Sequence, residues 1–264
     1  MNAVTTTPPT GGLRWAVSDA LAMTWRNLRG ATRVPQVLVF SLVQPVIFTL
    51  LFRYVFGGSI RIPGVDNYVD YLMPGIFTQT VCFGAINTAI GLAEDRGKGL
   101  LERLRTLPMS RSAVLAGRTL ADLVRNVVVA VLIIGIGFAV GFRAHGGVAR
   151  FLLGILVMVA FGFSLSWLFA LIGLSVTNGE AAQAAAFPLL APLAFASNLF
   201  ASPDSMPGWL QPWARHQPVS AAADAVRACM LGLPATHKVL VSLAWSLGFT
   251  VFFGAIAIRK YRNA

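Results

Sequence analysis

Residues 151–179 read FLLGILVMVAFGFSLSWLFALIGLSVTNG, an apolar run without a single charged side chain. A helix needs about 20 consecutive, mainly apolar residues to cross the roughly 30 Å of hydrocarbon in a bilayer. This run is long enough to cross even as a tilted helix. We therefore predict that the chain is an integral membrane protein.

The composition agrees with a membrane environment, because 56% of the 264 residues are hydrophobic and only 12% are charged. A soluble globular domain is typically about one quarter charged. The apolar runs are continuous rather than alternating, so helices fit better than the strands of a β-barrel. The predicted fold is all-α, with six transmembrane helices at residues 35–56, 69–93, 120–142, 151–176, 181–202 and 238–258.

These spans make residues 35–258 a transmembrane domain, flanked by tails at residues 1–34 and 259–264. The opening residues lack the basic start and apolar core of a cleaved signal peptide. Most Lys and Arg residues fall in the terminal segments and in the loop after the second span. The positive-inside rule therefore predicts that both termini are cytoplasmic. This distribution accounts for the net charge of +11, and no nucleic-acid partner is expected.

Residues 13–30, LRWAVSDALAMTWRNLRG, have the pattern of an amphipathic helix. At 100° per residue, Leu13, Val17, Leu21 and Leu28 share one face. Trp15 and Trp25 suit the headgroup region, so we expect this helix to lie flat in the interface. It is either a simple anchor or a lever that also touches a cytoplasmic partner.

The segment at residues 94–118, EDRGKGLLERLRTLPMSRSAVLAGR, is the most charged part of the chain. Four leucines recur within it at helical spacing: Leu100, Leu101, Leu104 and Leu107. Pro108 ends this helix because proline cannot continue the hydrogen-bond ladder. Topogenic charge alone would explain the arginines but would not require the leucines. We predict a cytoplasmic helix-turn-helix that docks a partner.

Residues 202–238 carry Trp209 and Trp213 one helical turn apart, followed by AAADAVRACMLGLP at residues 221–234. The second stretch can form a short helix, and the whole segment is predicted to be extracellular, either interfacial or partly re-entrant. The two tryptophans fit a membrane-interface belt. A gate on the outer face is the alternative.

The sequence offers no convergent set of nucleophile, base and metal ligands, so neither catalytic nor metal-binding residues are predicted. His145, His216 and His237 are not paired with Cys, Glu or Asp at ligand spacing. Cys82 and Cys229 are expected to be unpaired thiols. Four acidic residues are expected at span ends, which argues against a proton relay within the membrane: Asp70, Glu94, Asp122 and Glu180.

The second predicted span carries a polar and small-residue stripe. Its members are Thr80, Gly84, Asn87 and Gly91, with Gln79 and Phe83 beside them. The fifth span contains Pro188 and Pro192, which should kink it, with Phe187, Phe195 and Asn198 nearby. Such a stripe either packs against another helix or lines a pathway for an amphipathic molecule.

Residues 71–126 read YLMPGIFTQTVCFGAINTAIGLAEDRGKGLLERLRTLPMSRSAVLAGRTLADLVRN. This stretch closely resembles permease subunits of type 2 ATP-binding-cassette exporters related to the daunorubicin-resistance permeases. The six-span layout and the flat N-terminal helix are similar to that family over nearly the whole chain. The likeness of residues 94–111 to the Glu-Ala-Ala loop of importers is slight, so import is not inferred.

The resemblance implies a transport subunit that is not itself an enzyme. Its partners would be two cytoplasmic ATPase subunits that bind ATP and Mg, and a second copy of this chain or a similar permease. ATPase coupling is assigned to Glu94, Asp95, Arg96, Lys98, Glu102, Arg103, Arg105, Arg111, Arg26 and Arg29. The substrate pathway is assigned to Gln79, Thr80, Phe83, Asn87, Phe187, Phe195 and Asn198.

The function expected from this resemblance is ATP-driven export of an amphipathic drug or antibiotic. Related permeases also move lipids and lipid-linked glycans, so that cargo is the alternative. A scaffold without transport activity, or a secondary transporter, is the alternative of another class. Arginine outnumbers lysine and alanine is abundant, which is typical of a GC-rich bacterial genome and hence of a bacterial plasma membrane.

Overall fold

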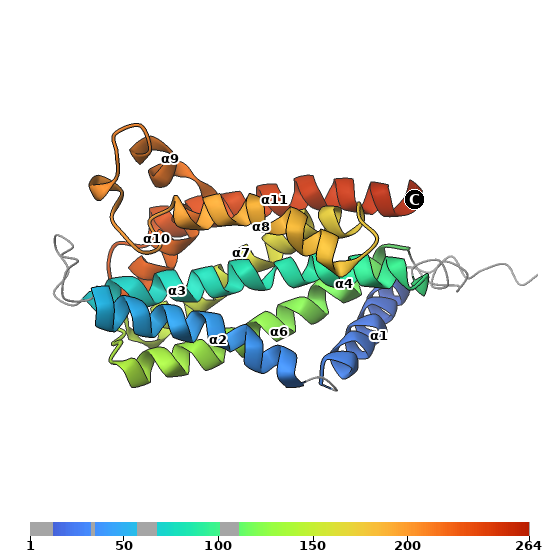
Figure 1. Cartoon of the computed structure of the whole chain (residues 1–264), viewed down its shortest axis with the longest axis horizontal. Helices are drawn as coiled ribbons and strands as arrows, with labels where there is room; N and C mark the ends of the chain where they lie inside the picture. The colour runs from blue at the N-terminus through green and yellow to red at the C-terminus, as the bar shows by residue number, and fades with distance from the viewer. Residues whose placement is uncertain (1–12, 33–34, 57–67, 101–110, 264) are drawn as a thin grey trace, which may run out of the picture.

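The computed structural model describes residues 13–32, 35–56, 68–100 and 111–263. Within these ranges every regular element is a helix, and no strand is present. This confirms the predicted all-α class. The long helices run side by side as a bundle (Figure 1).

The first half of the described chain consists of α1 (Leu13–Thr32), α2 (Pro35–Leu51), the π-helical turn η1 (Phe52–Phe56), α3 (Tyr68–Gly84), α4 (Ile86–Gly97) and α6 (Arg111–Val140). The second half consists of α7 (Gly147–Gly173), α8 (Gly179–Phe195), the 3-10 turn η2 (Pro203–Ser205), α9 (Gln211–His216), α10 (Pro218–Leu231) and α11 (Thr236–Asn263).

Four helical stretches are long and apolar enough to cross a membrane. They are Tyr68–Gly97, Val114–Val140, Gly147–Gly173 and Thr236–Tyr261. A shorter apolar stretch at Leu42–Val55 lies in α2 and η1, and α8 also runs along the bundle (Figure 1). The chain is therefore a multi-pass membrane protein.

Two predicted spans differ from the helices that form. Helix α6 begins at Arg111, before the predicted start of the third span at residue 120, so Asp122 lies inside the helix. The predicted fifth span reached residue 202, but α8 ends at Phe195. The residues after α8 are held by contacts with α3 and α10, which replace the helical hydrogen bonds there.

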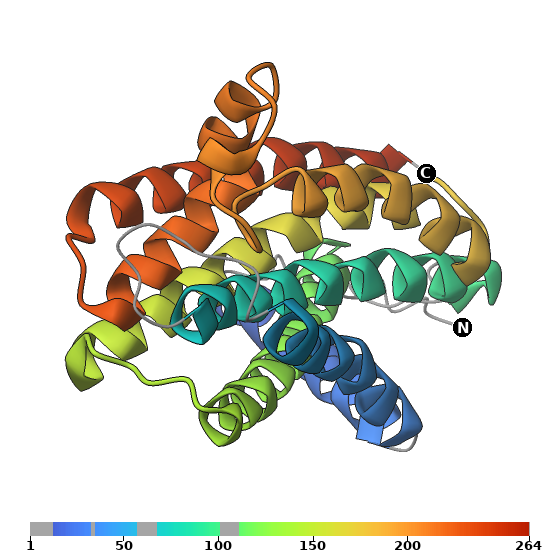
Figure 2. The same ribbon diagram turned by 60° about the vertical axis from the view of Figure 1, so that its left-hand side comes forward.

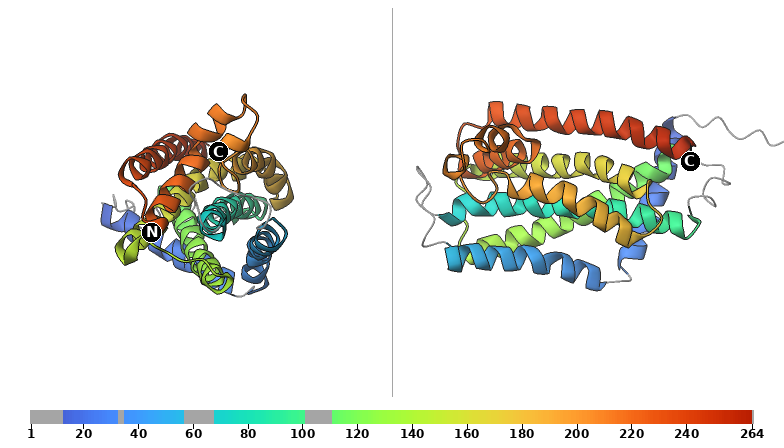
Figure 3. Two further views of the ribbon diagram at one scale, coloured as in Figure 1. Left: turned by 90° about the vertical axis from the view of Figure 1, so that its left-hand side faces the viewer. Right: turned by 45° about the horizontal axis from the view of Figure 1, so that its top comes forward.

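The centre of the bundle is the stretch formed by α3 and α4, which the view along the bundle shows surrounded by α2, α6, α7 and α8 (Figure 3). All residues from 71 to 82 are buried. Close approach is possible because small residues face this stretch: a Cβ atom on Gly162 of α7 would lie 2.0 Å from Val81 Cγ1. Small residues at such contacts are typical of helix packing in membranes.

Helix α1 crosses one end of the bundle, beside the C-terminal ends of α4 and α11 (Figure 3). Ala20 and Met23 are buried and lie against Gly117 of α6. The opposite side exposes apolar side chains, including Trp15, Leu21 and Trp25. Helix α1 therefore packs one side on α6 and leaves apolar side chains exposed on another, and its interfacial position stays a prediction.

The other end of the bundle carries η2, α9 and α10. Helix α9 stands away from the long helices, whereas α10 turns back among them (Figure 2). The short helix predicted within residues 221–234 forms as part of α10, which ends at Leu231 and is buried against α3, α7 and α11. Arg227 of α10 donates to the carbonyl oxygens of Tyr71 and Asn198 and pairs with Asp224.

Candidate functional site: a pocket beside the α3–α4 break

The hydrogen-bond pattern of the central stretch is disturbed at Ala85, between α3 and α4, although Ala85 keeps helical backbone angles. We call this point the α3–α4 break. The amide of Thr88 donates to the carbonyl oxygen of Ala85, and Asn87 Nδ2 donates to the carbonyl oxygen of Gly84 at 3.1 Å. A side chain thus satisfies a backbone acceptor at the break, as polar groups in a membrane must be satisfied internally. The break places Phe83 and Asn87 at the edge of a cavity.

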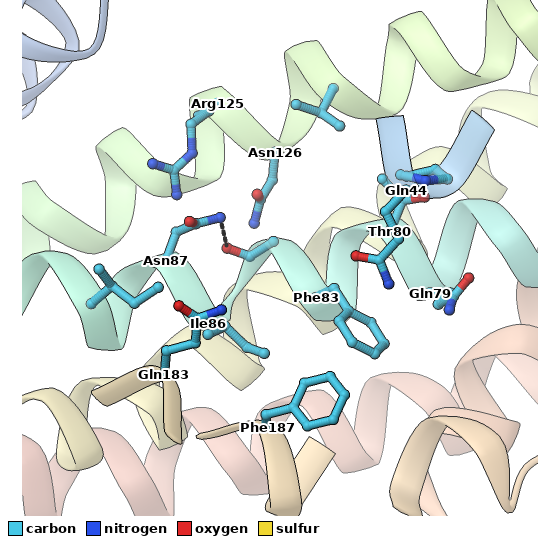
Figure 4. Close-up of a pocket in the computed structure, with 14 residues that line it drawn as sticks. Gln44, Gln79, Thr80, Phe83, Ile86, Asn87, Arg125, Asn126, Gln183 and Phe187 are labelled. Atoms are coloured by element: carbon cyan, nitrogen blue, oxygen red, sulfur yellow. Dashed lines mark hydrogen bonds between the residues drawn. The ribbon is translucent and has the colours of Figure 1, made fainter. Parts of the chain in front are cut away.

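This cavity has a volume of about 470 Å³ and lies between α2, the α3–α4 stretch, α6 and α8 (Figure 4). Its volume falls within the usual range of ligand pockets, which is about 300–1,000 Å³. The pocket is lined by Gln44, Pro45, Gln79, Thr80, Phe83, Gly84, Ile86, Asn87, Ile90, Arg125, Asn126, Val129, Gln183 and Phe187.

Carboxamide side chains form much of the polar lining. Gln79 and Asn126 are only 3% and 4% exposed, and their side-chain nitrogen atoms have no hydrogen-bond partner among the described residues. A buried donor without a partner costs about 1–3 kcal/mol. Figure 4 shows Asn126 reaching from α6 toward the α3–α4 break. The pocket therefore has hydrogen-bonding capacity that the protein itself leaves unused.

Aromatic rings line one flank of the pocket. Phe83 and Phe187 meet edge to face, with ring centroids 6.3 Å apart. Farther along α2 and α8, away from α1, four rings form a second cluster: Phe48, Phe52, Phe195 and Phe200. Phe52 and Phe200 stack with centroids 4.8 Å apart. The pocket thus combines polar groups with an aromatic wall, which suits an amphipathic molecule.

A chain of alternating charges connects the pocket with the end of α4. Arg118 Nη1 lies 3.3 Å from Asp95 Oδ2, and its Nε lies 3.5 Å from Asp122 Oδ2. Arg125 Nη2 lies 2.9 Å from Asp122 Oδ1. Each ionised residue within a span costs about 2.5–3.5 kcal/mol on insertion scales. Pairing opposite charges reduces this cost, which explains how α6 holds them inside an apolar stretch.

The small residues of the predicted stripe make room for α6. A Cβ atom on Gly84 would lie 2.3 Å from Asn126 Oδ1, and one on Gly91 would lie 1.3 Å from Arg118 Nη2. Both glycines therefore make room for α6, and Gly84 also lines the pocket together with Gln79, Thr80 and Asn87.

The end of α4 is tied to the neighbouring helices. Arg96 Nη1 donates to the carbonyl oxygen of Leu174 at the end of α7. Lys98 Nζ lies 3.2 Å from Glu94 Oε2, and both side chains are exposed. Lys260 of α11 donates to Ser175 Oγ at 2.6 Å. This end of the bundle is thus a polar surface that joins α4, α7 and α11.

The residues assigned to ATPase coupling are only partly described. Glu94, Asp95, Arg96 and Lys98 lie together at the end of α4. Arg111 begins α6, while Arg26 and Arg29 lie on α1, with the Arg29 guanidinium 5.1 Å from the ring centroid of Trp25. Glu102, Arg103 and Arg105 lie outside the described residues.

The structure brings together five of the residues assigned to the pathway: Gln79, Thr80, Phe83, Asn87 and Phe187. Phe195 belongs to the second aromatic cluster, and Asn198 is buried where its carbonyl oxygen accepts from Tyr71 and Arg227, so neither lines this pocket.

Sequence reasoning missed the lining residues Gln44, Arg125, Asn126 and Gln183. A weak signal for two of them was present, because Arg125 immediately precedes the charge-free run at residues 126–142 and Asn126 begins it.

The described residues contain no group of three or more His, Cys, Asp or Glu side chains that could hold a metal ion. The pocket lining includes an arginine and five carboxamides but no carboxylate. Its chemistry is therefore that of binding through hydrogen bonds and aromatic contacts.

Comparison with known proteins gives the family. Residues 19–231 match the family described as ABC-2 type transporter. The chain is 36% identical to the daunorubicin resistance ABC transporter permease protein DrrB1 of Streptomyces coeruleorubidus, with 98% of this chain and 95% of that protein covered. It is 28% identical to the probable doxorubicin resistance ABC transporter permease protein DrrC of Mycobacterium tuberculosis (strain CDC 1551 / Oshkosh), covering 95% and 91%. The chain belongs to the ABC-2 type transporter family.

A more distant similarity extends beyond such resistance proteins. The putative transport permease ycf38 of Cyanophora paradoxa is 30% identical, with 68% of this chain and 62% of that protein covered.

Proposed function

We propose that this chain is the membrane subunit of an ABC exporter that moves amphipathic drugs or antibiotics out of the cell. The observation that carries this proposal is the pocket of amides and aromatic rings at the α3–α4 break. It occurs in a member of the ABC-2 family whose relatives are named for daunorubicin and doxorubicin resistance. The energy would come from hydrolysis of ATP, which separate ATPase subunits would bind together with Mg.

In this proposal six segments cross a bacterial plasma membrane: α2 with η1, α3 with α4, α6, α7, α8 and α11. Both termini would be cytoplasmic, which places α1 at the cytoplasmic interface and α9 and α10 at the outer end. The exposed Trp15 and Trp25 of α1 support an interfacial position, because tryptophan favours the headgroup region.

Two ATPase subunits would dock at the end of α4, at residues 101–111 and at α1. The coupling residues in this proposal are Glu94, Asp95, Arg96, Lys98, Glu102, Arg103, Arg105, Arg111, Arg26 and Arg29. A second copy of this chain or a similar permease would complete the pathway, with α3–α4 and α8 facing it. Nucleotide-driven closure would then switch the pathway between inward-open and outward-open states, each with its own affinity for substrate.

The test of this proposal is affinity purification of the tagged chain from its native membrane in mild detergent. We expect an ATP-binding-cassette subunit to co-purify in equal amount, with ATPase activity that amphipathic compounds stimulate. A preparation free of any ATPase would contradict the proposal and favour a scaffold or a secondary transporter. Stimulation by lipid-linked glycans alone would favour the alternative cargo.

The role of the pocket is tested by the double variant Phe83→Ala/Asn87→Ala. Both side chains line the pocket, so we expect drug-stimulated ATPase activity to fall several-fold, with a smaller change in basal activity. The matched control is Phe163→Ala, which removes a ring from α7 that packs against Trp167. An unchanged response to drug in the double variant would assign these residues to packing alone.

A further inference from the structure

We infer that the charge chain formed by Asp95, Arg118, Asp122 and Arg125 transmits conformational change between the end of α4 and the pocket, and that Arg118 and Asp122 are its positioning residues. The inference rests on the proposed export function and specifies how the state of the ATPase subunits reaches the substrate. Neither Arg118 nor Asp122 lines the pocket, and neither belongs to the coupling residues proposed above.

The two ends of the charge chain lie in the two regions that an exporter must connect. Asp95 lies near the end of α4, among the residues proposed to couple to the ATPase. Arg125 lines the pocket and extends from α6 toward the α3–α4 stretch (Figure 4). Arg118 and Arg125 are roughly 10 Å apart along α6, at a rise of about 1.5 Å per residue. A continuous series of ion pairs thus covers the distance between the two regions.

At the first end, α4 lies directly on the guanidinium of Arg118. Arg118 Nη1 donates to Asp95 Oδ2 at 3.3 Å. A Cβ atom on Gly91 would overlap the same guanidinium, so no side chain separates it from the backbone of α4. A displacement of α4 relative to α6 therefore moves Arg118.

The middle contact of the charge chain is the loosest, and it provides a second way of pairing. Arg118 Nε and Asp122 Oδ2 are 3.5 Å apart, and neither atom has a hydrogen-bond partner among the described residues. The other oxygen of Asp122 lies 2.9 Å from Arg125 Nη2. When α4 withdraws Asp95, Arg118 can move onto Asp122 and form the missing hydrogen bond. Asp122 then holds Arg125 less firmly, and the wall of the pocket changes.

The exchange adds no net charge to the membrane interior, because the chain contains two arginines and two aspartates in either pairing. Asp122 is only 3% exposed, so water does not replace its partners, and the carboxylate has to share two arginines. Coupling between two sites is reciprocal. A substrate that shifts Arg125 therefore also shifts the end of α4.

The experiment measures how nucleotide changes the affinity for a drug. The probe is doxorubicin, a fluorescent amphipath that appears in the name of one relative. Its dissociation constant is measured by fluorescence anisotropy on the full transporter with its ATPase subunits in nanodiscs, with and without Mg and the non-hydrolysable ATP analogue AMP-PNP. We expect the analogue to weaken binding to the wild type about fivefold or more, as is usual for coupled sites. No effect of the analogue on the wild type would overturn the inference.

Variants then test the two positioning residues. Asp122→Asn and Arg118→Gln should each reduce the nucleotide effect to less than about twofold, while the dissociation constant without nucleotide changes by less than about threefold. Asp122→Glu should retain part of the effect because it keeps the carboxylate. The matched control is Asp224→Asn, because Asp224 also pairs at 2.9 Å with an arginine three positions later, but at the other end of the bundle. The control should keep the wild-type nucleotide effect.

A nucleotide effect of wild-type size in a folded Asp122→Asn or Arg118→Gln variant would overturn the inference and leave the chain with charge compensation alone. An equal loss in Asp224→Asn would also overturn it, since weakened packing would then explain the loss. The side chain of Arg118 is 18% exposed and that of Asp122 only 4%, so Arg118→Gln still decides if Asp122→Asn does not fold. The proposed export function fails differently, through the absence of a co-purifying ATPase, so the two failures can be told apart.

Discussion

Gly117 and Gly135 both lie in α6, but only Gly117 faces another helix. A Cβ atom on Gly117 would lie 2.4 Å from Met23 Cβ and 2.8 Å from the carbonyl oxygen of Ala20, both in α1. Nothing lies within 4 Å of the corresponding position on Gly135. Substituting each of the two residues by alanine therefore separates the effect of a helix contact from the intrinsic helix propensity of glycine.

We expect Gly117→Ala to destabilise the protein, because overpacking costs about 1–3 kcal/mol. Gly135→Ala should be neutral or stabilising by up to about 1 kcal/mol, since alanine is the better helix former. The measurement is the apparent unfolding temperature of each variant in detergent, followed by tryptophan fluorescence. Equal unfolding temperatures for the two variants would show that α1 does not pack against Gly117.

The contacts of Arg227 also allow the effect of a substitution on stability to be predicted. It donates to two carbonyl oxygens, pairs with Asp224 at 2.9 Å and lies 3.7 Å from the ring centroid of Tyr71. These contacts fasten α10 to α3 and to the segment after α8. They also explain why a charged residue is 95% buried at this end of the bundle.

Arg227→Met should therefore reduce the free energy of unfolding by about 3–5 kcal/mol, the usual cost of removing one partner from a buried pair. Lysine at this position should not restore stability, because it cannot reproduce the planar fork of donors. Arg215→Met is the control: Arg215 pairs with Asp204 on the exposed surface, where such pairs contribute about 0–1 kcal/mol. A loss of equal size in both variants would contradict this role for Arg227.

At the scale of elements, α4 and α6 are connected by the ion pair between Asp95 and Arg118. Both side chains are 18% exposed, and the residues are separated by 23 positions along the chain. The second ion pair of Arg118, with Asp122, lies within α6 itself. Mutating the Asp95–Arg118 pair therefore tests whether the end of α4 is held against α6.

A double-mutant cycle with Asp95→Asn and Arg118→Gln should give a coupling energy of about 0.5–3 kcal/mol, as expected for residues in direct contact. The same cycle on Glu94 and Lys98, an exposed pair one turn apart at the end of α4, should give about 0.3–0.5 kcal/mol. Unfolding of detergent-solubilised protein in urea provides the free energies. A coupling near zero for Asp95 and Arg118 would mean that the two helices are not joined by this pair.

The elements also show which parts of the fold a sequence can reveal. Continuous apolar runs predicted the long helices, because length and composition alone decide whether a segment can cross a bilayer. The third span was predicted from residue 120, whereas α6 begins at Arg111 and pairs its Arg118 with Asp95 of α4. That contact joins residues far apart in sequence, and no local pattern contains it.

The candidate site, like the fold, was only partly predictable from the sequence. The polar stripe of α3 and α4 indicated Thr80 and Asn87 because they share one helical face, and it indicated Gln79 because it lies beside that face. Arg125 and Gln183 come from other helices, and only the packing of α6 and α8 against the α3–α4 break brings them to the same cavity. Helical periodicity identifies a face, but not the partner that meets it.

At the scale of the whole molecule, the two ends of the bundle differ in character. One end carries α1, the end of α4 and the basic end of α11, while the other carries α9 and the buried α10 (Figure 1). An exporter needs the first end in the cytoplasm, where ATP is available. The excess of Lys and Arg in the terminal segments supports this orientation.

The native cysteines allow this orientation to be tested without a cysteine-free background. Cys82 and Cys229 are both completely buried. Burial raises the pKa of the Cys229 thiol, although the nearby Arg150 opposes part of the shift. Because the thiolate is the reactive form, this cysteine should remain unlabelled by maleimides at pH 7.

Ser205→Cys in η2 and Lys98→Cys after α4 place one exposed thiol at each end of the bundle. We expect a membrane-impermeant maleimide to label Ser205→Cys in intact cells, and to label Lys98→Cys only after the membrane is opened. The reverse pattern would put the end of α4 outside the cell, where no ATPase could reach it. Labelling of both variants in intact cells would put the end of α4 and η2 on the same side of the membrane. The chain would then cross an even number of times between them instead of the three times proposed. Because α6, α7 and α8 are the three segments between these positions, the expected pattern requires an odd number of crossings, and it would exclude that exactly one of them, such as the proline-containing α8, fails to cross.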